Sequence, residues 1–392
     1  MNPVICSIAR TPIGRFNGAF SQLSAVDLGG AAIAAAIQRS GLDASQLDEV
    51  IFGHVIQAGQ GQITSRQAAV RGGVPMTVPA TTINKVCLSG MTAIQEAANH
   101  IRLGESTFVV AGGMESMTNA PYVLPGARAG LKMGDATLVD TMTHDGLFCA
   151  FDSCMMGESS DAKNTELGID RSTQDAWSAA SHARAAAAAD SGVFDDEIVP
   201  VTVPQRRGDA LVVDTDEGIR RETTLESLGA LRPAFDPDGT ITAGNASQIS
   251  DGAAAVVVAD RSAAEAAGLP ILAEMVAYGQ VAGPDATLHE RPAEAIRVAM
   301  KRVGVGIDDI DLFEINEAFA SVALHSADML GLDHDRVNIH GGAVALGHPL
   351  GATGARLVVT LVNALRSTDG RMGAAALCGG GGQGDAMIIR MV

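Results

Sequence analysis

Aromatic side chains are scarce in this 392-residue sequence, in which Phe, Trp and Tyr together make up 3% of the residues. Proteins that bind single-stranded nucleic acids stack bases on such rings, so this scarcity argues against that class. Basic residues are also few, because 27 Lys and Arg stand against 45 Asp and Glu, which gives a net charge of −18. A surface this acidic repels phosphate backbones and anionic lipids, so we expect no nucleic-acid partner and no membrane partner.

Long hydrophobic runs are absent as well. No apolar stretch approaches the roughly 18 residues that a membrane span requires, and the N-terminus lacks the basic and apolar regions of a signal peptide. The five cysteines show no Cys-x-x-Cys spacing, so we predict neither a disulfide framework nor a zinc site. These features predict a cytoplasmic protein whose thiols stay reduced.

Apolar residues and glycine are plentiful, at 47% of the chain and 45 residues respectively. Helical and strand-like apolar patterns alternate along the sequence, which predicts an α/β protein with a large core. The length favours two or three domains over one.

One order of elements occurs twice. A helix that ends at Gly41 is followed by a short apolar strand, and the same pair recurs 263 residues later with a helix ending at Gly304. A helix that opens near Ser89 recurs near Gly351, at an offset of 262 residues. Coincidence among short elements is the alternative, but several elements at nearly one offset favour a duplication.

We therefore predict an N-terminal half over residues 1–268 and a C-terminal half over 269–392. The first half carries an insertion over about 114–248 that is rich in turns and methionine. Within it we predict one helix with Ser172 as its N-cap and residues 177–189 as its body.

Cys87 and His348 occupy nearly equivalent places in the two halves, 261 residues apart and each just before a predicted helix. If the halves pack about a pseudo-twofold axis, both residues reach facing helix N-termini. A helix dipole favours a thiolate, which predicts a lowered pKa for Cys87, and a nearby histidine can accept its proton. A lone cysteine is more often a small buried hydrophobe, but the flanking glycines and the matched histidine favour a nucleophile and its base.

Cys378 ends an apolar strand and precedes a glycine-rich run that matches Gly-x-Gly-x-x-Gly. Only eight residues follow that run and they are strand-like, so no helix is available to bind a dinucleotide pyrophosphate. Bare backbone N–H groups suit a developing oxyanion instead. Asn316 and Glu317 close another predicted strand, where a helix cap is the simpler interpretation.

Together these segments resemble the four active-site blocks of the thiolase family, and the resemblance spans the whole chain. The blocks are Cys87 with Ser89-Gly90, Asn316-Glu317-Ala318-Phe319, Gly347-His348-Pro349 and Cys378-Gly379-Gly380. The resemblance implies an α/β fold of duplicated βαβαβαββ halves in a five-layered αβαβα arrangement, with central helices between two sheets. That implication agrees with the repeat found in the element order.

The resemblance also implies a mechanism. Cys87 would take an acyl group from a CoA thioester while His348 accepts its proton, and Cys378 would then remove an α-proton from a second acetyl-CoA. One oxyanion hole would comprise His348 and a water held by Asn316, and the other the backbone N–H groups of Cys87 and Gly380. The scheme needs no metal and no redox cofactor, and its partners are acetyl-CoA, acetoacetyl-CoA and CoA.

Five further positions match family contacts to the substrate. Arg220 matches a position near the adenosine 3′-phosphate, and Ser247 matches a pantetheine contact. Phe235 and Phe319 match apolar walls of the pocket, and Met156 lies in a segment near it. A solvated surface charge is the plain alternative for an arginine.

Two segments depart from the pattern of biosynthetic thiolases. Met155 stands where those enzymes carry histidine, and Leu288-His289-Glu290-Arg291 replaces a Met-Gly-x-Gly sequence. These departures leave the acyl-chain length and the metabolic direction open. The first hypothesis, from the four active-site blocks, is an acetyl-CoA acetyltransferase that condenses two acetyl-CoA into acetoacetyl-CoA. The alternative is a degradative 3-ketoacyl-CoA thiolase of broader chain length in fatty-acid β-oxidation.

Two more distant alternatives fit less well. Decarboxylating or malonyl-using condensing enzymes of the superfamily typically lack a second cysteine, so Cys378 argues against them. A non-catalytic lipid-binding relative would not need all four catalytic positions. The methionine-rich stretch over 114–142 has too little pattern for a core of its own, so we expect a homodimer or homotetramer that covers part of it.

Overall fold

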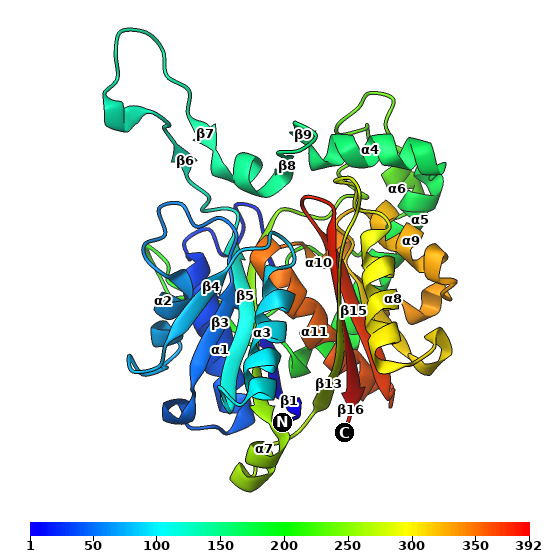
Figure 1. Ribbon diagram of the computed structural model, residues 1–392. Coiled ribbons are helices and arrows are strands. Elements are labelled where there is room, and N and C mark those ends of the chain that lie inside the picture. Colours follow the sequence, from blue (N-terminus) through cyan, green and yellow to red (C-terminus); the bar gives the residue numbers. More distant parts are fainter.

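The computed structural model describes all 392 residues and is built around one large mixed sheet (Figure 1). Its strands run in the order β14-β15-β16-β13-β1-β12-β5-β3-β4, and the short β2 pairs with β12. Their bounds are β1 Pro3–Arg10, β2 Gly14–Arg15, β3 Glu49–Gly53, β4 Ala80–Ile83, β5 Phe108–Ser116, β12 Ser250–Asp260, β13 Ala273–Ala282, β14 Leu312–Ile315, β15 Met372–Gly379 and β16 Gln383–Met391.

The sheet consists of two halves with the same internal order. In one half β12 lies antiparallel between β1 and β5, and β3 runs parallel to β5. In the other half β16 lies antiparallel between β13 and β15, and β14 runs parallel to β15. The halves are joined only where Val4 and Ile5 of β1 pair with Glu274 and Ala273 of β13. The predicted duplication is therefore confirmed, although hydrogen bonds at one end link the two expected sheets into one.

Helices complete five layers, which are visible from left to right in Figure 1. The outer helices α1 and α2 cover the first half-sheet, α3 and α11 lie between the two halves, and α8 and α9 cover the second. Their bounds are α1 Ala25–Ser40, α2 Thr64–Arg71, α3 Ser89–Leu103, α8 Arg291–Val303, α9 Ala320–Leu330 and α11 Leu350–Ser367. This is the αβαβα arrangement predicted from the sequence.

Local sequence signals account for the ends of these helices. Ser24 begins α1 with a capping box in which its side chain and that of Asp27 bond each other's backbone N–H. Gly41 ends α1 and Gly304 ends α8, both at a φ of 74°, which glycine adopts without strain. The repeated glycines in the sequence are therefore helix C-caps.

The core is divided among the layers. Apolar side chains of α3 and α11 pack with inward-facing residues of both half-sheets, and separate clusters fill the spaces under α1 and under α8. Every residue of β5 and of β15 is buried, because helices cover both faces of these strands. Apolar burial on both sides of each half-sheet fixes the strand ends that carry the site.

The insertion of the first half replaces a tight turn. Residues 117–249 connect β5 to β12, whereas the equivalent strands β15 and β16 are joined by Gly380–Gly382. The elements of the insertion are β6 Tyr122–Val123, β7 Val139–Asp140, a π-helix Met142–Leu147, β8 Phe148–Cys149, β9 Cys154–Met155, α4 Met156–Leu167, α5 Arg171–Ser191, β10 Val201–Val203, β11 Leu211–Val213 and α6 Leu225–Gly229. The part of the insertion with β6 to β9 and α4 lies above the sheet in Figure 1 and sends one long loop away from the body, whereas Val193 and Asp196 contact the far end of α11.

The predicted cap of the insertion's main helix is wrong by two residues. Asp170, rather than Ser172, caps α5, because its carboxylate accepts the backbone N–H of Thr173. Two further helices complete the chain, α7 Arg261–Ala267 after β12 and α10 Ala343–Leu346 before α11. None of the helices combines the length and apolarity needed to cross a membrane.

Candidate active site

The two cysteines and the histidine singled out in the sequence line one buried cavity of about 50 Å³. Cys87 lies in the loop between β4 and α3, His348 lies just before α11, and Cys378 lies near the end of β15. The remaining lining is mostly apolar and comes from seven segments of the chain: Gly146, Leu147, Met156, Ser247, Leu288, Ala318, Phe319, Leu350 and Gly379.

Backbone contact between the two central helices brings the loops that carry Cys87 and His348 together. A Cβ atom on Gly90 of α3 would lie 2.8 Å from the backbone nitrogen of Ala355 in α11. A Cβ on Gly354 would lie 2.4 Å from the backbone nitrogen of Met91. No larger residue fits either position, so these glycines set how closely the N-terminal turns of α3 and α11, and the loops before them, approach each other.

The thiol of Cys87 is not acidic in this structure. Burial raises its pKa to about 12, and the carboxylate of Glu115 adds to the rise. Hydrogen bonds from the backbone N–H groups of Cys87 and Gly380 act in the opposite direction, but desolvation outweighs them. The lowered pKa expected from the helix N-terminus is therefore wrong, because the helix begins two residues later and burial of the thiol outweighs the helix dipole.

His348 is held in one tautomer by a hydroxyl group. Its Nδ1 lies 2.7 Å from Oγ1 of Thr353, whose hydroxyl donates its only proton to the backbone oxygen of Pro349 at 2.9 Å. Nδ1 must then be the donor to Thr353, so the neutral ring carries its lone pair on Nε2. Nε2 is buried without a hydrogen-bond partner. Burial, with the positive charge of Arg356, lowers the pKa of His348 to about 3, so the ring is neutral at pH 7.

Cys378 and Asn316 lie at the ends of two neighbouring strands. Burial raises the pKa of Cys378, and a negative charge on Cys87 would raise it further, which reflects the proximity of the two sulfur atoms. Asn316 follows β14, and both polar atoms of its buried amide lack a protein partner. Such a group requires a water or a ligand to satisfy it.

Glu317, next to Asn316, has a structural role. Its carboxylate accepts hydrogen bonds from Trp177 Nε1, Ser181 Oγ, Asn338 Nδ2 and the backbone N–H of Val344, all between 2.8 and 3.0 Å. These partners belong to α5, to α10 and to the segment before α10. Glu317 therefore ties the insertion to the strand end that presents Asn316.

The expected substrate contacts are distributed around the cavity. Met156, Ser247 and Phe319 line it directly, and Phe235 packs edge to face on Phe319 with ring centroids 6.3 Å apart. The backbone N–H of Ser247 donates to Ala318 at 3.1 Å, which fixes it beside the apolar wall. Arg220 is exposed and lies outside the cavity lining.

Sequence reasoning missed three parts of the site. Leu147 and Leu350 line the cavity, and Thr353 orients the histidine. Leu147 ends a π-helix inside a stretch without periodicity, so no pattern marks it. Thr353 is five residues after His348, a spacing that suggests contact only once the turn into α11 is known.

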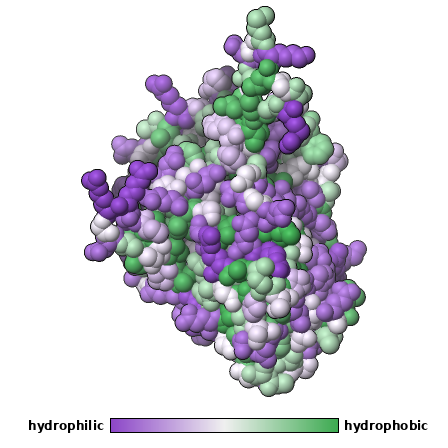
Figure 2. Space-filling view, turned by 90° about the vertical axis from the view of Figure 1, so that its left-hand side faces the viewer, coloured by the Kyte–Doolittle hydropathy of each residue, from purple (hydrophilic) through white to green (hydrophobic).

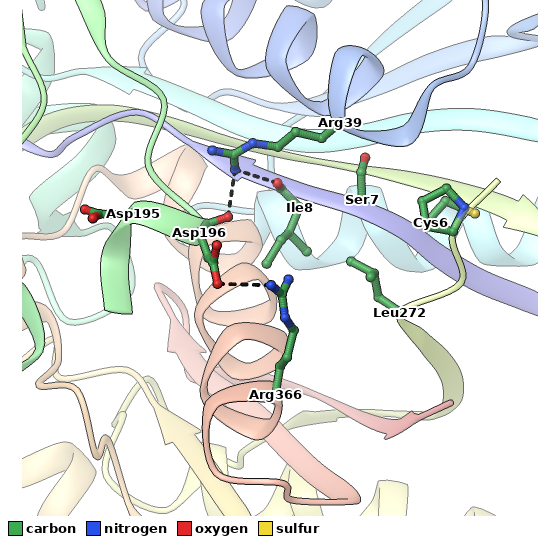
Figure 3. A pocket seen from close by; sticks show the side chains of 9 residues that line it. Cys6, Ser7, Ile8, Arg39, Asp195, Asp196, Leu272 and Arg366 are labelled. Carbon is green, nitrogen blue, oxygen red and sulfur yellow. Dashed lines mark hydrogen bonds and ion pairs between the residues drawn. The ribbon is translucent and has the colours of Figure 1, made fainter. Parts of the chain in front are cut away.

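A second, more open pocket of about 300 Å³ lies elsewhere on the molecule (Figure 3). It includes Arg366 at the far end of α11, roughly 24 Å along the helix from Leu350, which lines the first cavity. The guanidinium of Arg39 already bonds backbone oxygens, and Arg366 pairs with Asp196 at 3.1 Å. Burial raises the pKa of its only thiol, Cys6, to about 12, and no base lies beside it. This pocket offers no chemistry comparable to that of the first.

The family models for thiolases match nearly the whole chain. The model described as "Thiolase, N-terminal domain" matches residues 3–262, and "Thiolase, C-terminal domain" matches residues 269–391. The chain belongs to the thiolase family. The boundary between the two matches in this thiolase falls at α7, which connects β12 of the first half-sheet to β13 of the second along the chain.

Named relatives of this thiolase are similar over their full length. It is 51% identical to the probable acetyl-CoA acetyltransferase of Mycolicibacterium smegmatis, over 99% of this chain and 100% of that protein. It is 48% identical to the acetyl-CoA acetyltransferase of Escherichia coli, over 99% and 98%. The crystal structure of the Bacillus anthracis acetyl-CoA acetyltransferase superposes with a TM-score of 0.97 at 41% identity, covering 100% of this chain and 99% of that one.

Proposed function

We propose that this thiolase is an acetyl-CoA C-acetyltransferase that reversibly converts two acetyl-CoA into acetoacetyl-CoA and CoA. The observation that carries the proposal is the meeting of two thiols and an unpartnered imidazole nitrogen in one buried cavity. The names of its full-length relatives point to the same reaction.

The first step transfers an acetyl group to Cys87. As its sulfur attacks the thioester carbon, the proton moves to Nε2 of His348, and collapse of the tetrahedral intermediate returns that proton to the departing CoA sulfur. Both groups are neutral at rest because burial disfavours their charged forms, so charge separates only during the attack. The backbone N–H groups of Cys87 and Gly380, which both lower the pKa of the Cys87 thiol, are suited to bind the developing oxyanion.

The second step forms the carbon–carbon bond. Cys378 first passes its thiol proton to Nε2 of His348 and then, as a thiolate, removes an α-proton from a second acetyl-CoA. The enolate carbon attacks the acetyl carbon on Cys87, the carbon–sulfur bond breaks to release acetoacetyl-CoA, and the Cys87 sulfur takes the proton back from His348. Asn316 has a buried amide without protein partners, which fits a water that, with His348, binds the enolate oxygen. Proton transfer to a sulfur base is plausible because the same donors stabilise the enolate as it forms.

The surroundings of the cavity support a CoA thioester as substrate. Ser247 and Met156 would contact the pantetheine, Phe235 and Phe319 would wall the acyl group, and the exposed Arg220 would meet the adenosine 3′-phosphate. The scheme requires no metal and no redox cofactor. It requires free thiols, which favours a cytoplasmic setting.

The alternative function is that of a degradative 3-ketoacyl-CoA thiolase of broad chain length. It is less favoured, because the relatives are named acetyl-CoA acetyltransferase. The cavity is small, and Leu288 and Phe319 are buried against each other at its wall. We expect kcat/KM for thiolysis to be highest for acetoacetyl-CoA, lower for 3-ketohexanoyl-CoA, and to fall clearly beyond. A series of 3-ketoacyl-CoA lengths measures this, and a maximum at eight carbons or longer would establish the alternative.

The decisive test of the proposed reaction is the acylation of Cys87. Brief exposure to acetyl-CoA should add one acetyl group, located on Cys87 by mass spectrometry of peptides. His348→Asn should slow that labelling about 100-fold or more, because it removes the base without removing the thiol. Equal labelling of Cys6, Cys149 or Cys154 would contradict the assignment.

For assembly we propose a homotetramer built from dimers. The edge of β14 is covered, because the side chain of Asn338 bonds both backbone groups of Ile315, whereas β4 ends the sheet at the other edge without a partner strand. An unpaired edge invites pairing with a second chain. The projecting loop exposes Leu131, Met133 and Leu138, and it stands clear of the body at the top of Figure 2. Pairing at β4 would form the dimer, and the loop would join two dimers.

A further inference from the structure

Lys85 and Asp385 form an ion pair next to the segments that carry Cys87 and Cys378. Nζ of Lys85 is 2.8 Å from Oδ1 and 2.9 Å from Oδ2 of Asp385. Asp385 is fully buried, and only 14% of the Lys85 side chain is exposed. The hydroxyl of Thr92, in α3, donates a third hydrogen bond to Oδ2 at 3.0 Å. The carboxylate therefore has a fixed position relative to both the lysine and the helix.

The pair joins the two segments that carry the reacting groups. Lys85 is two residues before Cys87 in the loop between β4 and α3. Asp385 belongs to β16, where it lies opposite Leu377, and its neighbour Gly384 lies opposite Cys378. The turn between β15 and β16 contributes the N–H of Gly380. One ion pair thus connects the nucleophile's loop to the hairpin that carries Cys378 and Gly380.

The loop that Lys85 belongs to is strained at the next residue. Val86 has a φ of +50°, a left-handed conformation that a β-branched residue rarely adopts. Such strain persists only where surrounding contacts hold it. Within the loop itself, Ser89 Oγ accepts the backbone N–H of Lys85 and donates to the backbone oxygen of Val86. From the neighbouring hairpin, Gly380 lies against the side chain of Val86. A Cβ atom added to Gly380 would be 3.5 Å from that side chain.

We propose that Lys85 and Asp385 are positioning residues for the acyl-transfer and condensation steps. They hold the Cys87 loop against the hairpin, so that the N–H groups of Cys87 and Gly380 converge on one point and the two sulfurs keep their separation. Neither side chain touches the reacting atoms. This inference rests on the proposed function, because it assigns the pair's effect to the chemistry of Cys87 and Cys378.

The test compares Asp385→Asn, Lys85→Met and the double variant with Glu49→Gln. The control breaks the pair between Glu49 and His100, which lies at the other end of α3. A shift of about 1 Å in a reacting group costs on the order of 100-fold in rate. We expect kcat for acetoacetyl-CoA thiolysis to fall about 10- to 100-fold in both single variants, with KM changed less than about 3-fold. The double variant should be no worse than the worse single one, because the two residues act as a unit.

Two more variants separate positioning from stability. Lys85→Arg should restore most of kcat, because a guanidinium can bond both oxygens of Asp385. Thr92→Val removes one bond to Asp385 without leaving an unpaired charge, and it should lower kcat by less than Asp385→Asn. If Asp385→Asn does not fold, an unchanged kcat in Thr92→Val would overturn the inference and a reduced kcat would support it.

The outcomes for the inference and for the function are distinct. A folded Asp385→Asn protein with a lower melting temperature and normal kcat would show that the pair only stabilises the fold, and would overturn the inference while leaving the function intact. A wild-type protein that takes no acetyl group on Cys87 would overturn the proposed function itself. Glu49→Gln should keep normal kcat in either case.

Discussion

The buried thiols of Cys87 and Cys378 differ mainly in which backbone N–H groups lower their pKa values. The backbone N–H groups of Cys87 and Gly380 both lower the pKa of Cys87, whereas only its own backbone N–H lowers that of Cys378. Each hydrogen bond stabilises the thiolate relative to the thiol. This difference is consistent with the proposed roles, in which Cys87 attacks a carbonyl whose oxygen takes over the same two donors and Cys378 acts as the base for a carbon acid.

Substituting Cys378 with serine should separate the two half-reactions. Acetylation of Cys87 should persist within about 10-fold, while condensation should slow by about 1000-fold or more, because a hydroxyl is a far weaker base than a thiolate. Mass spectrometry reports the first step, and exchange of acetyl-CoA α-protons with deuterated water reports the second. Near-normal exchange in the variant would remove Cys378 from the role of base.

At the scale of elements, the loop between β6 and β7 contacts little of its own chain. Val123 pairs with Val139 at its base, and the residues between them include Leu131 and Met133, whose side chains are 64% and 106% exposed. Apolar side chains held this far from the core have no stabilising role in a single chain. The loop is therefore the natural contact of the proposed tetramer.

Replacing residues 124–138 with an Asn-Gly turn should convert tetramers into dimers. The turn fits the antiparallel pair that the loop now closes, so the fold should be retained. Light scattering measures the mass before and after, and kcat per chain should change less than about 3-fold, since no residue of the loop lines the cavity. A wild-type chain that is monomeric in solution would contradict the whole assembly proposal.

At the scale of the molecule, burial of histidines makes the fold sensitive to acid. Burial lowers the pKa of His182 and of His289 to about 4, and that of His348 to about 3. In the unfolded chain the pKa of each histidine returns to about 6.5. Between that pH and the lower pKa of the folded protein, the unfolded state therefore binds more protons than the folded state. The stabilisation is complete above about pH 6.5 and is lost as the pH falls toward 4. Glu314 acts oppositely, since burial raises its pKa to about 8 and its contribution is lost as the pH rises through that value.

His182→Asn should reduce the sensitivity to acid. Nδ1 of His182 accepts the backbone N–H of Arg220 at 3.2 Å, and the amide oxygen of asparagine can accept the same bond without titrating. Between pH 7 and pH 4.5 the free energy of unfolding should fall by about 2 kcal/mol less in the variant than in the wild type. Urea unfolding at a series of pH values measures it, and parallel curves for the two proteins would refute this role of His182.

Much of the fold was predictable because its signals are local. Apolar periodicity located the central helices and the main strands. Gly41 and Gly304 marked helix ends regardless of how those helices pack. The repeat followed from element order alone, since each half must bury its strands in the same way. Within the insertion such signals are weak, and Asp170 took the cap expected of Ser172 because both residues can cap a helix and only the path of the chain selects one.

The sequence by itself determined which residues are chemically able to act: a cysteine and a histidine at equivalent places before two helices, and a second cysteine before bare glycines. Only the tertiary structure decided how they behave. Cys87 and His348 are both neutral because burial disfavours their charged forms, which outweighs the helix dipole on which the sequence-based expectation relied. Likewise the pairing of Lys85 with Asp385 spans 300 residues. No local pattern records such a contact, because it exists only where two half-sheets pack around shared helices.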